Sequence, residues 1–180
     1  LPQPGSFPVR LEDNPGDPPP VDWPGVVTPL LDLPESHPAN VYLAGRGFEP
    51  RSTADRWGLV WCSRAREPRL RLAEQRIIIP VLRKGVMVGW QGRWPAELNW
   101  KESRLNKYQT LTGMRKRFLI YNGDVALSRP FAIVVEGPTS AWPLWPNGCA
   151  TFGNSVSYHQ LAMLGEYCKS HPLVIIMDPD

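Results

Sequence analysis

Two carboxylate-bearing segments contain the residues of this sequence best suited to chemistry. Glu136 directly follows the apolar run Ala132–Val135, and the pair Asp178 and Asp180 directly follows a second apolar run, Leu173–Met177. Short apolar runs rich in β-branched residues are typical of strands buried on both faces of a parallel sheet. Ligands bind such sheets at the carboxyl ends of the strands. Because Mg²⁺ is commonly held by one or two carboxylates together with substrate phosphates, these three carboxylates predict a metal site.

The charge is distributed unevenly along the chain. The net charge is +3, but residues 46–117 hold seventeen basic and six acidic residues, a net charge of +11. Residues 1–45 carry −5 and residues 118–180 carry −3. This distribution predicts that a polyanion binds across the basic residues 46–117 and that a metal ion binds in the acidic residues 118–180. Five tryptophans lie among the basic residues, and their rings could either stack on single-stranded bases or pack in the core. They are Trp57, Trp61, Trp90, Trp94 and Trp100.

Composition and periodicity divide the chain into three regions. Residues 1–38 contain eleven of the twenty-one prolines and are expected to form an extended acidic linker with little regular structure. Residues 39–125 are expected to form a basic α+β unit. Residues 126–180 alternate strand and helix patterns, which predicts an α/β unit with a mainly parallel sheet. The chain begins at Leu1 without a methionine and stops at the second carboxylate segment, so we expect a partial segment that is truncated at its C-terminus.

The patterns also predict individual elements. Short helices are expected at 39–44 and 53–57, the second opened by a capping box of Ser52 and Asp55. The polar, Arg-rich residues 61–75 are expected to be a mobile connection. Residues 77–83 and 86–90 form a hairpin pattern around Lys84-Gly85, with Pro80 at an edge or a bulge. The other expected elements are strands at 107–111, 118–121, 131–136, 149–152 and 173–177, a short or kinked helix after residue 136, and a helix at 157–168.

Several classes of protein are disfavoured by the composition. The three cysteines are widely spaced and show no zinc-binding pattern, which predicts no zinc in this segment and a reduced, cytoplasmic setting. No apolar run approaches the length of a membrane span, so no membrane partner is expected. His159 and His171 have no partner at metal-binding spacing and are interpreted as surface residues.

Seven short motifs follow one another in a fixed order from Tyr42 to Asp180. They are YLAGRGF at 42–48, RIIIPVLRKGVMVGWQGR at 76–93, KY at 107–108, KRFLIYN at 116–122, VEG at 135–137, FGNS at 152–155 and MDPD at 177–180. This series resembles the catalytic core of DnaG-type bacterial and phage primases, in which a basic subdomain related to RNA polymerases precedes a TOPRIM domain. The resemblance identifies residues 39–125 with that basic α+β subdomain. It identifies residues 126–180 with an incomplete α/β TOPRIM-like domain.

The resemblance implies a DNA primase, which joins ribonucleoside triphosphates into short RNA primers on a single-stranded DNA template with Mg²⁺ or Mn²⁺. It further implies a phage or mobile-element source and a replicative helicase as a further partner. Glu136, Asp178 and Asp180 would then be the catalytic, metal-holding residues. The positions that match basic residues contacting template or nucleotide are Arg46, Arg93, Lys107 and Lys116.

The sequence also departs from the family pattern. Ser140 stands where the family carries an aspartate four residues after the glutamate equivalent to Glu136, and Pro143 and Pro146 interrupt the helix that follows. These departures leave two alternatives open beside primer synthesis. One is a catalytically weakened, primase-derived module that binds single-stranded DNA. The other is a different TOPRIM chemistry, such as nuclease or topoisomerase action.

Overall fold

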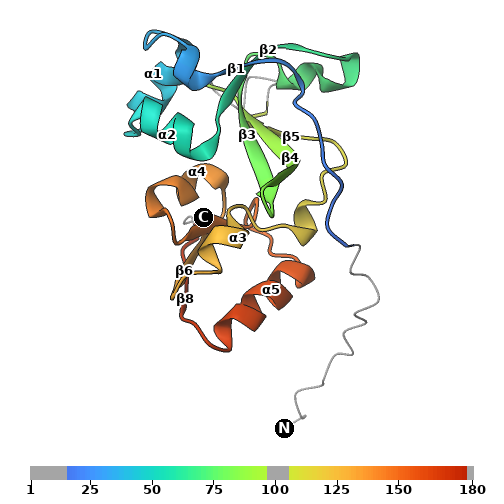
Figure 1. Cartoon of the computed structure of the whole chain (residues 1–180), viewed down its shortest axis with the longest axis vertical. Helices are drawn as coiled ribbons and strands as arrows, with labels where there is room; N and C mark the ends of the chain where they lie inside the picture. Colours follow the sequence, from blue (N-terminus) through green and yellow to red (C-terminus); the bar gives the residue numbers. More distant parts are fainter. Residues whose placement is uncertain (1–15, 97–105, 178–180) are drawn as a thin grey trace.

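Two β-sheets, one antiparallel and one parallel, organise the chain (Figure 1). The computed structural model of the chain describes residues 16–96 and 106–177. The first sheet has the strand order β1-β2-β3-β4-β5, and the second has the order β7-β6-β8. No helix within the described ranges is both long and apolar enough to cross a membrane.

The five-stranded sheet is built around the expected hairpin. Its strands are β1 Gly25–Pro29, β2 Val60–Ala65, β3 Arg76–Arg83, β4 Val86–Arg93 and β5 Tyr108–Thr110, and every neighbouring pair is antiparallel. Lys84 and Gly85 both have positive φ values, 50° and 78°, which the tight turn between β3 and β4 requires. Pro80 pairs with Trp90 of β4, whereas β2 pairs with β3 only as far as Ile78. Pro80 therefore lies where β3 is locally an edge strand.

Two short helices cover one end of this sheet, α1 Pro38–Gly45 and α2 Pro50–Trp57. The expected helix at 39–44 is confirmed. The second helix begins three residues earlier than expected, because the Glu49 side chain, and not Ser52, caps it by accepting hydrogen bonds from the backbone N–H groups of Arg51 and Ser52.

Two expectations for the first half of the chain are wrong. Residues 1–38 were expected to be an extended linker with little regular structure, yet β1 and the 3₁₀ turn Leu30–Asp32 lie within them, and Leu30 is fully buried. Residues 61–75 were expected to be a mobile connection, yet they contribute β2 and the 3₁₀ segment Pro68–Ala73. The buried apolar positions in these stretches pair with and pack on the sheet, and this packing outweighs the polar, Pro-rich local composition.

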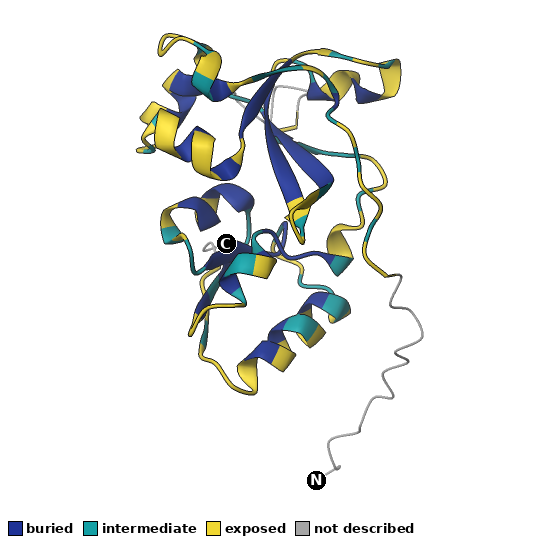
Figure 2. Cartoon of the chain, viewed as in Figure 1, coloured by how far each residue is buried: buried dark blue, intermediate teal, exposed yellow. Residues whose placement is uncertain are grey.

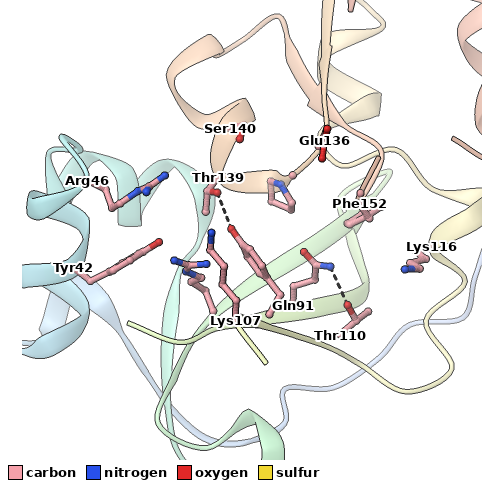
Figure 3. Close-up of a pocket in the computed structure, with 15 residues that line it drawn as sticks. Tyr42, Arg46, Gln91, Lys107, Thr110, Lys116, Glu136, Thr139, Ser140 and Phe152 are labelled. Carbon is pink, nitrogen blue, oxygen red and sulfur yellow. Dashed lines mark hydrogen bonds between the residues drawn. The ribbon is translucent and has the colours of Figure 1, made fainter. Parts of the chain in front are cut away.

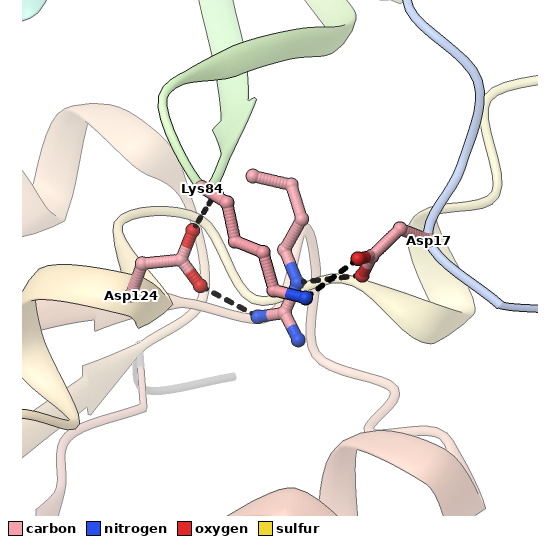
Figure 4. A network of polar contacts seen from close by, with 4 residues as sticks. Asp17, Lys84 and Asp124 are labelled. Atoms are coloured by element: carbon pink, nitrogen blue, oxygen red, sulfur yellow. Dashed lines mark hydrogen bonds and ion pairs between the residues drawn. The ribbon is translucent and has the colours of Figure 1, made fainter.

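A polar network fastens the N-terminal segment to the hairpin and the hairpin to α3 (Gly123–Ala126) (Figure 4). Asp17 accepts from Lys84 Nζ at 2.7 Å and from Arg83 Nε at 3.4 Å, and Arg83 Nη1 donates to Asp124 at 2.6 Å. The hydrogen bond from Lys84 lowers the pKa of the Asp17 carboxyl below its ordinary value, and Arg83 acts in the same direction.

The second sheet confirms the expected strand and helix alternation. Its parallel strands are β6 Ala132–Val135, β7 Gly148–Ala150 and β8 Leu173–Ile175. The connection from β6 to β7 is the short α4 Pro138–Ala141 followed by a 3₁₀ turn, Trp142–Leu144, as the prolines predict. Residues 118–121 do not form the expected strand. The 3₁₀ turn Lys116–Phe118 occupies its start, and Tyr121 makes one isolated bridge to Ala150.

Helix α5, Tyr158–Cys168, is fixed to neighbouring loops through Gln160. Ser157 and Gln160 form a capping box at its start. The fully buried Gln160 amide also reaches three backbone carbonyls, those of Lys116 at 3.1 Å, Leu119 at 2.8 Å and Thr151 at 3.0 Å. One side chain therefore joins α5 to two loops of the chain.

Both apolar runs were expected to be strands buried on both faces of the sheet, and this prediction holds for β6 but is wrong for β8. Three of the four β6 residues are buried, whereas Val174 and Ile175 of β8 are 47% and 61% exposed. Strand β8 lies at the edge of the sheet, so it has only one neighbouring strand.

One aromatic core joins the two sheets. The Trp57 ring stacks on Tyr121 at 5.4 Å and on Trp142 at 6.4 Å, measured between ring centroids. Buried residues accordingly continue from the helices and strands of the first unit into the second (Figure 2). Trp57, Trp61 and Trp90 are all buried, so the packing alternative is confirmed for these three tryptophans.

Candidate functional site

A polar cleft of about 420 Å³ lies between the β4–β5 face of the first sheet and the segment after β6 (Figure 3). Four cationic side chains and one carboxylate line it. The lining residues are Tyr42, Arg46, Gln91, Arg93, Lys107, Tyr108, Thr110, Lys116, Glu136, Gly137, Pro138, Thr139, Ser140, Phe152 and Gly153. The formal charge of this lining is +3, which favours an anionic ligand.

The alternation of strand side chains forms the first wall. Gln91 pairs with Thr110, and Arg93 pairs with Tyr108, in the antiparallel register of β4 and β5. Because side chains two residues apart lie on the same face of a strand, all four point to one face. The Gln91 amide donates to Thr110 Oγ1 at 2.9 Å, a cross-strand pair that orders this wall.

Arg93 is the most unusual side chain of the cleft. It is only 4% exposed, and its guanidinium carbon lies 5.0 Å from the centre of the Tyr42 ring and 4.8 Å from that of Tyr108. Within the described part of the chain its Nε and Nη1 atoms have no hydrogen-bond partner. A buried charge normally requires pairing, so unsatisfied donors on a cleft-lining guanidinium indicate a place for an anion.

A second buried guanidinium lies behind this wall. Arg76 is 2% exposed and donates from Nη1 to the backbone carbonyl of Asn106 at 2.9 Å. Burial, reinforced by the charge of Arg93, lowers the pKa of Arg76. Burial also raises the pKa of the Tyr42 hydroxyl, although the nearby Arg93 acts against this shift. The two guanidinium groups thus concentrate positive potential where β4 meets β5.

The opposite wall begins with Glu136, directly after the carboxyl end of β6. The loop after β7 is tied to it, since Gly153 N–H donates to the Glu136 carbonyl at 2.8 Å. Phe152, the preceding residue, has a φ of 69°. Left-handed backbone is uncommon for a bulky residue and gathers at functional sites. This strained turn therefore belongs to the wall that presents the Glu136 carboxylate.

A hydrogen bond crosses the cleft. Tyr108 Oη and Thr139 Oγ1 are 2.7 Å apart, which joins β5 of the first sheet to α4 of the second unit (Figure 3). Thr139 is buried, whereas the neighbouring Ser140 is exposed. The two sheets are thus connected at the cleft as well as through the aromatic core.

The structure brings together the predicted site residues that it describes. Glu136 and the four predicted cations all line the same cleft, although they are up to 90 positions apart in the sequence. Asp178 and Asp180 lie outside the described residues. The residues that sequence reasoning did not assign to the site are Tyr42, Gln91, Tyr108, Thr110 and Thr139. Three of them, Gln91, Tyr108 and Thr110, join Arg93 on one face only through the register of β4 and β5, for which the sequence carries no direct signal.

The described part of the cleft has one carboxylate, Glu136. No group of three or more His, Cys, Asp or Glu side chains able to hold a metal occurs among the described residues. Strand β8 runs parallel to β6, and Ile176 N–H donates to the Val134 carbonyl at 2.9 Å. The described chain therefore ends, at Met177, on the same edge of the sheet as Glu136.

Comparison of the sequence with family models and with curated proteins finds no match. Comparison of the structure finds solved primases. The RNA polymerase domain of Mycobacterium tuberculosis primase DnaG superposes with a TM-score of 0.62 at 21% identity over 84% of this chain and 62% of that chain. The chain has the fold of a DnaG-type primase catalytic core. The resemblance stated from the motifs is confirmed at the level of the fold.

Two further primase structures superpose similarly. The zinc-binding and RNA polymerase domains of Aquifex aeolicus primase match with a TM-score of 0.64 at 20% identity, over 80% of this chain and 43% of that chain. A DnaG primase catalytic domain bound to single-stranded DNA matches with a TM-score of 0.60 at 18% identity, over 84% and 57%. The chain thus spans between 43% and 62% of the length of these three primase structures.

Proposed function

We propose that the chain is the catalytic part of a DNA primase, which joins ribonucleoside triphosphates into RNA primers on single-stranded DNA. The observation that carries this proposal is the cleft, in which four cations from the basic segment face Glu136 within a primase-core fold. One of the structural neighbours is itself bound to single-stranded DNA. Phosphoryl transfer depends chiefly on positioning and on neutralising phosphate charge, and this cleft offers both.

Each cation has a distinct position for this task. Arg93 is buried and held between two rings, so its guanidinium is suited to grip a phosphate at a fixed point. Arg46, Lys107 and Lys116 are exposed at the cleft and are suited to follow a flexible nucleic-acid backbone as point charges.

The proposal includes a TOPRIM-type metal site formed by Glu136 with Asp178 and Asp180. Carboxylate oxygens are the donors that Mg²⁺ and Mn²⁺ prefer, and the position of Glu136 at the carboxyl edge of β6 fits this role. A divalent cation, when bound, would neutralise charge on the reacting phosphates. Glu136 itself would hold the metal and accept a proton from the attacking hydroxyl. Cytoplasmic replication with a helicase partner remains a prediction.

The test is primer synthesis on single-stranded DNA with labelled ribonucleotides and Mg²⁺ or Mn²⁺. We expect Glu136→Gln to abolish the product, because the change removes the charge while keeping the shape. Glu166→Gln is the matched control, since Glu166 is an exposed carboxylate on α5 that pairs with Lys169 outside the cleft. Absence of RNA product from the wild-type protein, or an undiminished product from Glu136→Gln, would refute the proposal.

A second candidate function is binding of single-stranded DNA without polymerisation. It is favoured by Ser140, which lines the cleft where a further carboxylate is expected, so that the described cleft holds only one acid. Salt-sensitive DNA binding without primer synthesis would support this candidate. A gain of metal-dependent activity in Ser140→Asp would show that this position limits function.

A further inference from the structure

We propose that the hydrogen bond between Tyr108 and Thr139 positions Arg93 for anion binding, so that both hydroxyl-bearing residues are positioning residues of the cleft. The inference rests on the proposed phosphate-binding role of the cleft and adds to it the contact that holds the principal cation in place.

The first step is the dependence of Arg93 on its two neighbouring rings. Arg93 is flanked by Tyr42 and Tyr108, and its Nε and Nη1 atoms make no hydrogen bond to any described residue. Cation–π contacts are attractive but weakly directional compared with hydrogen bonds. The location of the guanidinium is therefore set largely by the rings, and a shift of either ring would move the charge.

The second step is the difference in how the two rings are held. Tyr42 lies within α1 and is 9% exposed, so the helix and its packing fix it. Tyr108 is the first residue of the three-residue strand β5, and it is only half-buried. Its hydroxyl contact with Thr139 at 2.7 Å is a tertiary restraint on the outer end of the ring.

The third step is the like charge that lies near Arg93. Arg76 is also buried, and its pKa is lowered by this burial and, further, by the nearby charge of Arg93. Like charges repel, so Arg93 needs a contact that holds it against its 4.8 Å neighbour, the Tyr108 ring. A fixed Tyr108 ring supplies this contact and keeps the Arg93 guanidinium in the wall of the cleft. Thr139 lies three residues after Glu136, so the same bond sets the cation relative to the carboxylate wall.

A double-mutant cycle tests the inference in the 180-residue chain, with Tyr108→Phe, Thr139→Val and the double variant. The readouts are the dissociation constant for inorganic tripolyphosphate, from calorimetry at low salt, and the urea unfolding free energy. Loss of the bond frees the outer end of the Tyr108 ring beside Arg93, so we expect each single variant to weaken binding by about 2- to 10-fold. The double variant should bind no more weakly than either single variant, because both remove one shared contact.

Matched controls separate this role from ordinary packing. Tyr167→Phe removes a partly buried hydroxyl that donates to the Arg129 carbonyl outside the cleft. Thr53→Val makes the same change as Thr139→Val at an equally buried position, 8% exposed, in α2. Both should leave tripolyphosphate affinity within 2-fold. Thr139→Ser, which keeps the hydroxyl, should bind tripolyphosphate with the affinity of the wild type, unlike Thr139→Val.

Three outcomes would overturn the inference. They are unaltered affinity in the single variants even if stability falls, effects that multiply in the double variant, and absence of tripolyphosphate binding by the wild-type chain. Failure here with Glu136-dependent primer synthesis intact would leave the proposed function standing. Conversely, the wild-type protein could make no primers while the single and double variants lose tripolyphosphate affinity to the same extent. That result would refute the proposed function but support the positioning role of Tyr108 and Thr139.

Discussion

Replacing Gln160 by leucine is expected to be strongly destabilising, although this residue touches no ligand in the proposed function. Its side-chain amide lies within 3.1 Å of three buried or partly buried carbonyls, those of Lys116, Leu119 and Thr151. The Lys116 carbonyl also accepts from the Leu119 N–H, so within the described chain the substitution leaves two carbonyls, those of Leu119 and Thr151, without a donor. Each such loss costs about 1–3 kcal/mol.

Two smaller effects modify this estimate. Loss of the capping box with Ser157 adds about 0.5–1 kcal/mol, whereas the apolar leucine regains about 1 kcal/mol or more through burial. The expected net loss is about 2–5 kcal/mol, against a total stability of about 5–15 kcal/mol for an ordinary protein. With a urea m-value of about 2 kcal/mol/M, the unfolding midpoint should fall by about 1–2.5 M.

Urea unfolding followed by tryptophan fluorescence measures the effect. Gln109→Leu is the matched control, because the Gln109 amide donates to the carbonyl of the adjacent Thr110 and, in the described ranges, to no distant segment. A Gln160→Leu protein within 1 kcal/mol of wild type would refute the reasoning that this amide is the donor on which α5 and two loops depend.

Three further predictions concern charge and thiols. Single-stranded DNA binding should weaken with salt at a slope of up to about −3 in log–log form for four cations, and Lys116→Ala should reduce its magnitude by about 0.7 in a fluorescence titration. Alkylation at pH 8, followed by mass spectrometry, should modify the exposed Cys168 first, because Cys62 and Cys149 are buried and burial raises the pKa of Cys149 to about 12. The hydrogen bond from Lys84 lowers the pKa of Asp17 below its ordinary value of 3.8. The stability advantage of wild type over Asp17→Asn should therefore be present above pH 3.8 and disappear as the pH falls through the lower native pKa. A constant difference in unfolding free energy down to about pH 2 would contradict this account.

Elements with strong local patterns were predictable from the sequence. The hairpin of β3 and β4 has two apolar strands around Lys84-Gly85, and α5 begins with a serine and a glutamine at capping-box spacing. Strand β1 was not predictable, because GVVTP lies in a Pro-rich region whose composition favours extended chain and whose pairing partner, β2, is 35 residues away in the sequence. Long-range pairing of this kind leaves no local signal.

The charged residues of the cleft were predictable, but the neutral ones were not. Arg93 and Glu136 are suited to phosphate chemistry by their charge alone, and the motifs placed them in the correct order. Gln91 and Thr139 acquire a role only from the strand register and from a contact between the two sheets. No single-sequence pattern specifies which hydroxyl of one unit meets which hydroxyl of another.

The stacking of Trp57 on Tyr121 and Trp142 limits how the two regions of the chain can be exchanged by genetic recombination. Trp57 precedes the 125/126 boundary expected from the sequence and Trp142 follows it, so one aromatic core spans both sides. Recombination at that boundary would give each descendant half a core with large rings facing water, at a cost of several kcal/mol. The cleft is therefore expected to pass between genomes only as a whole, with cations and carboxylate together.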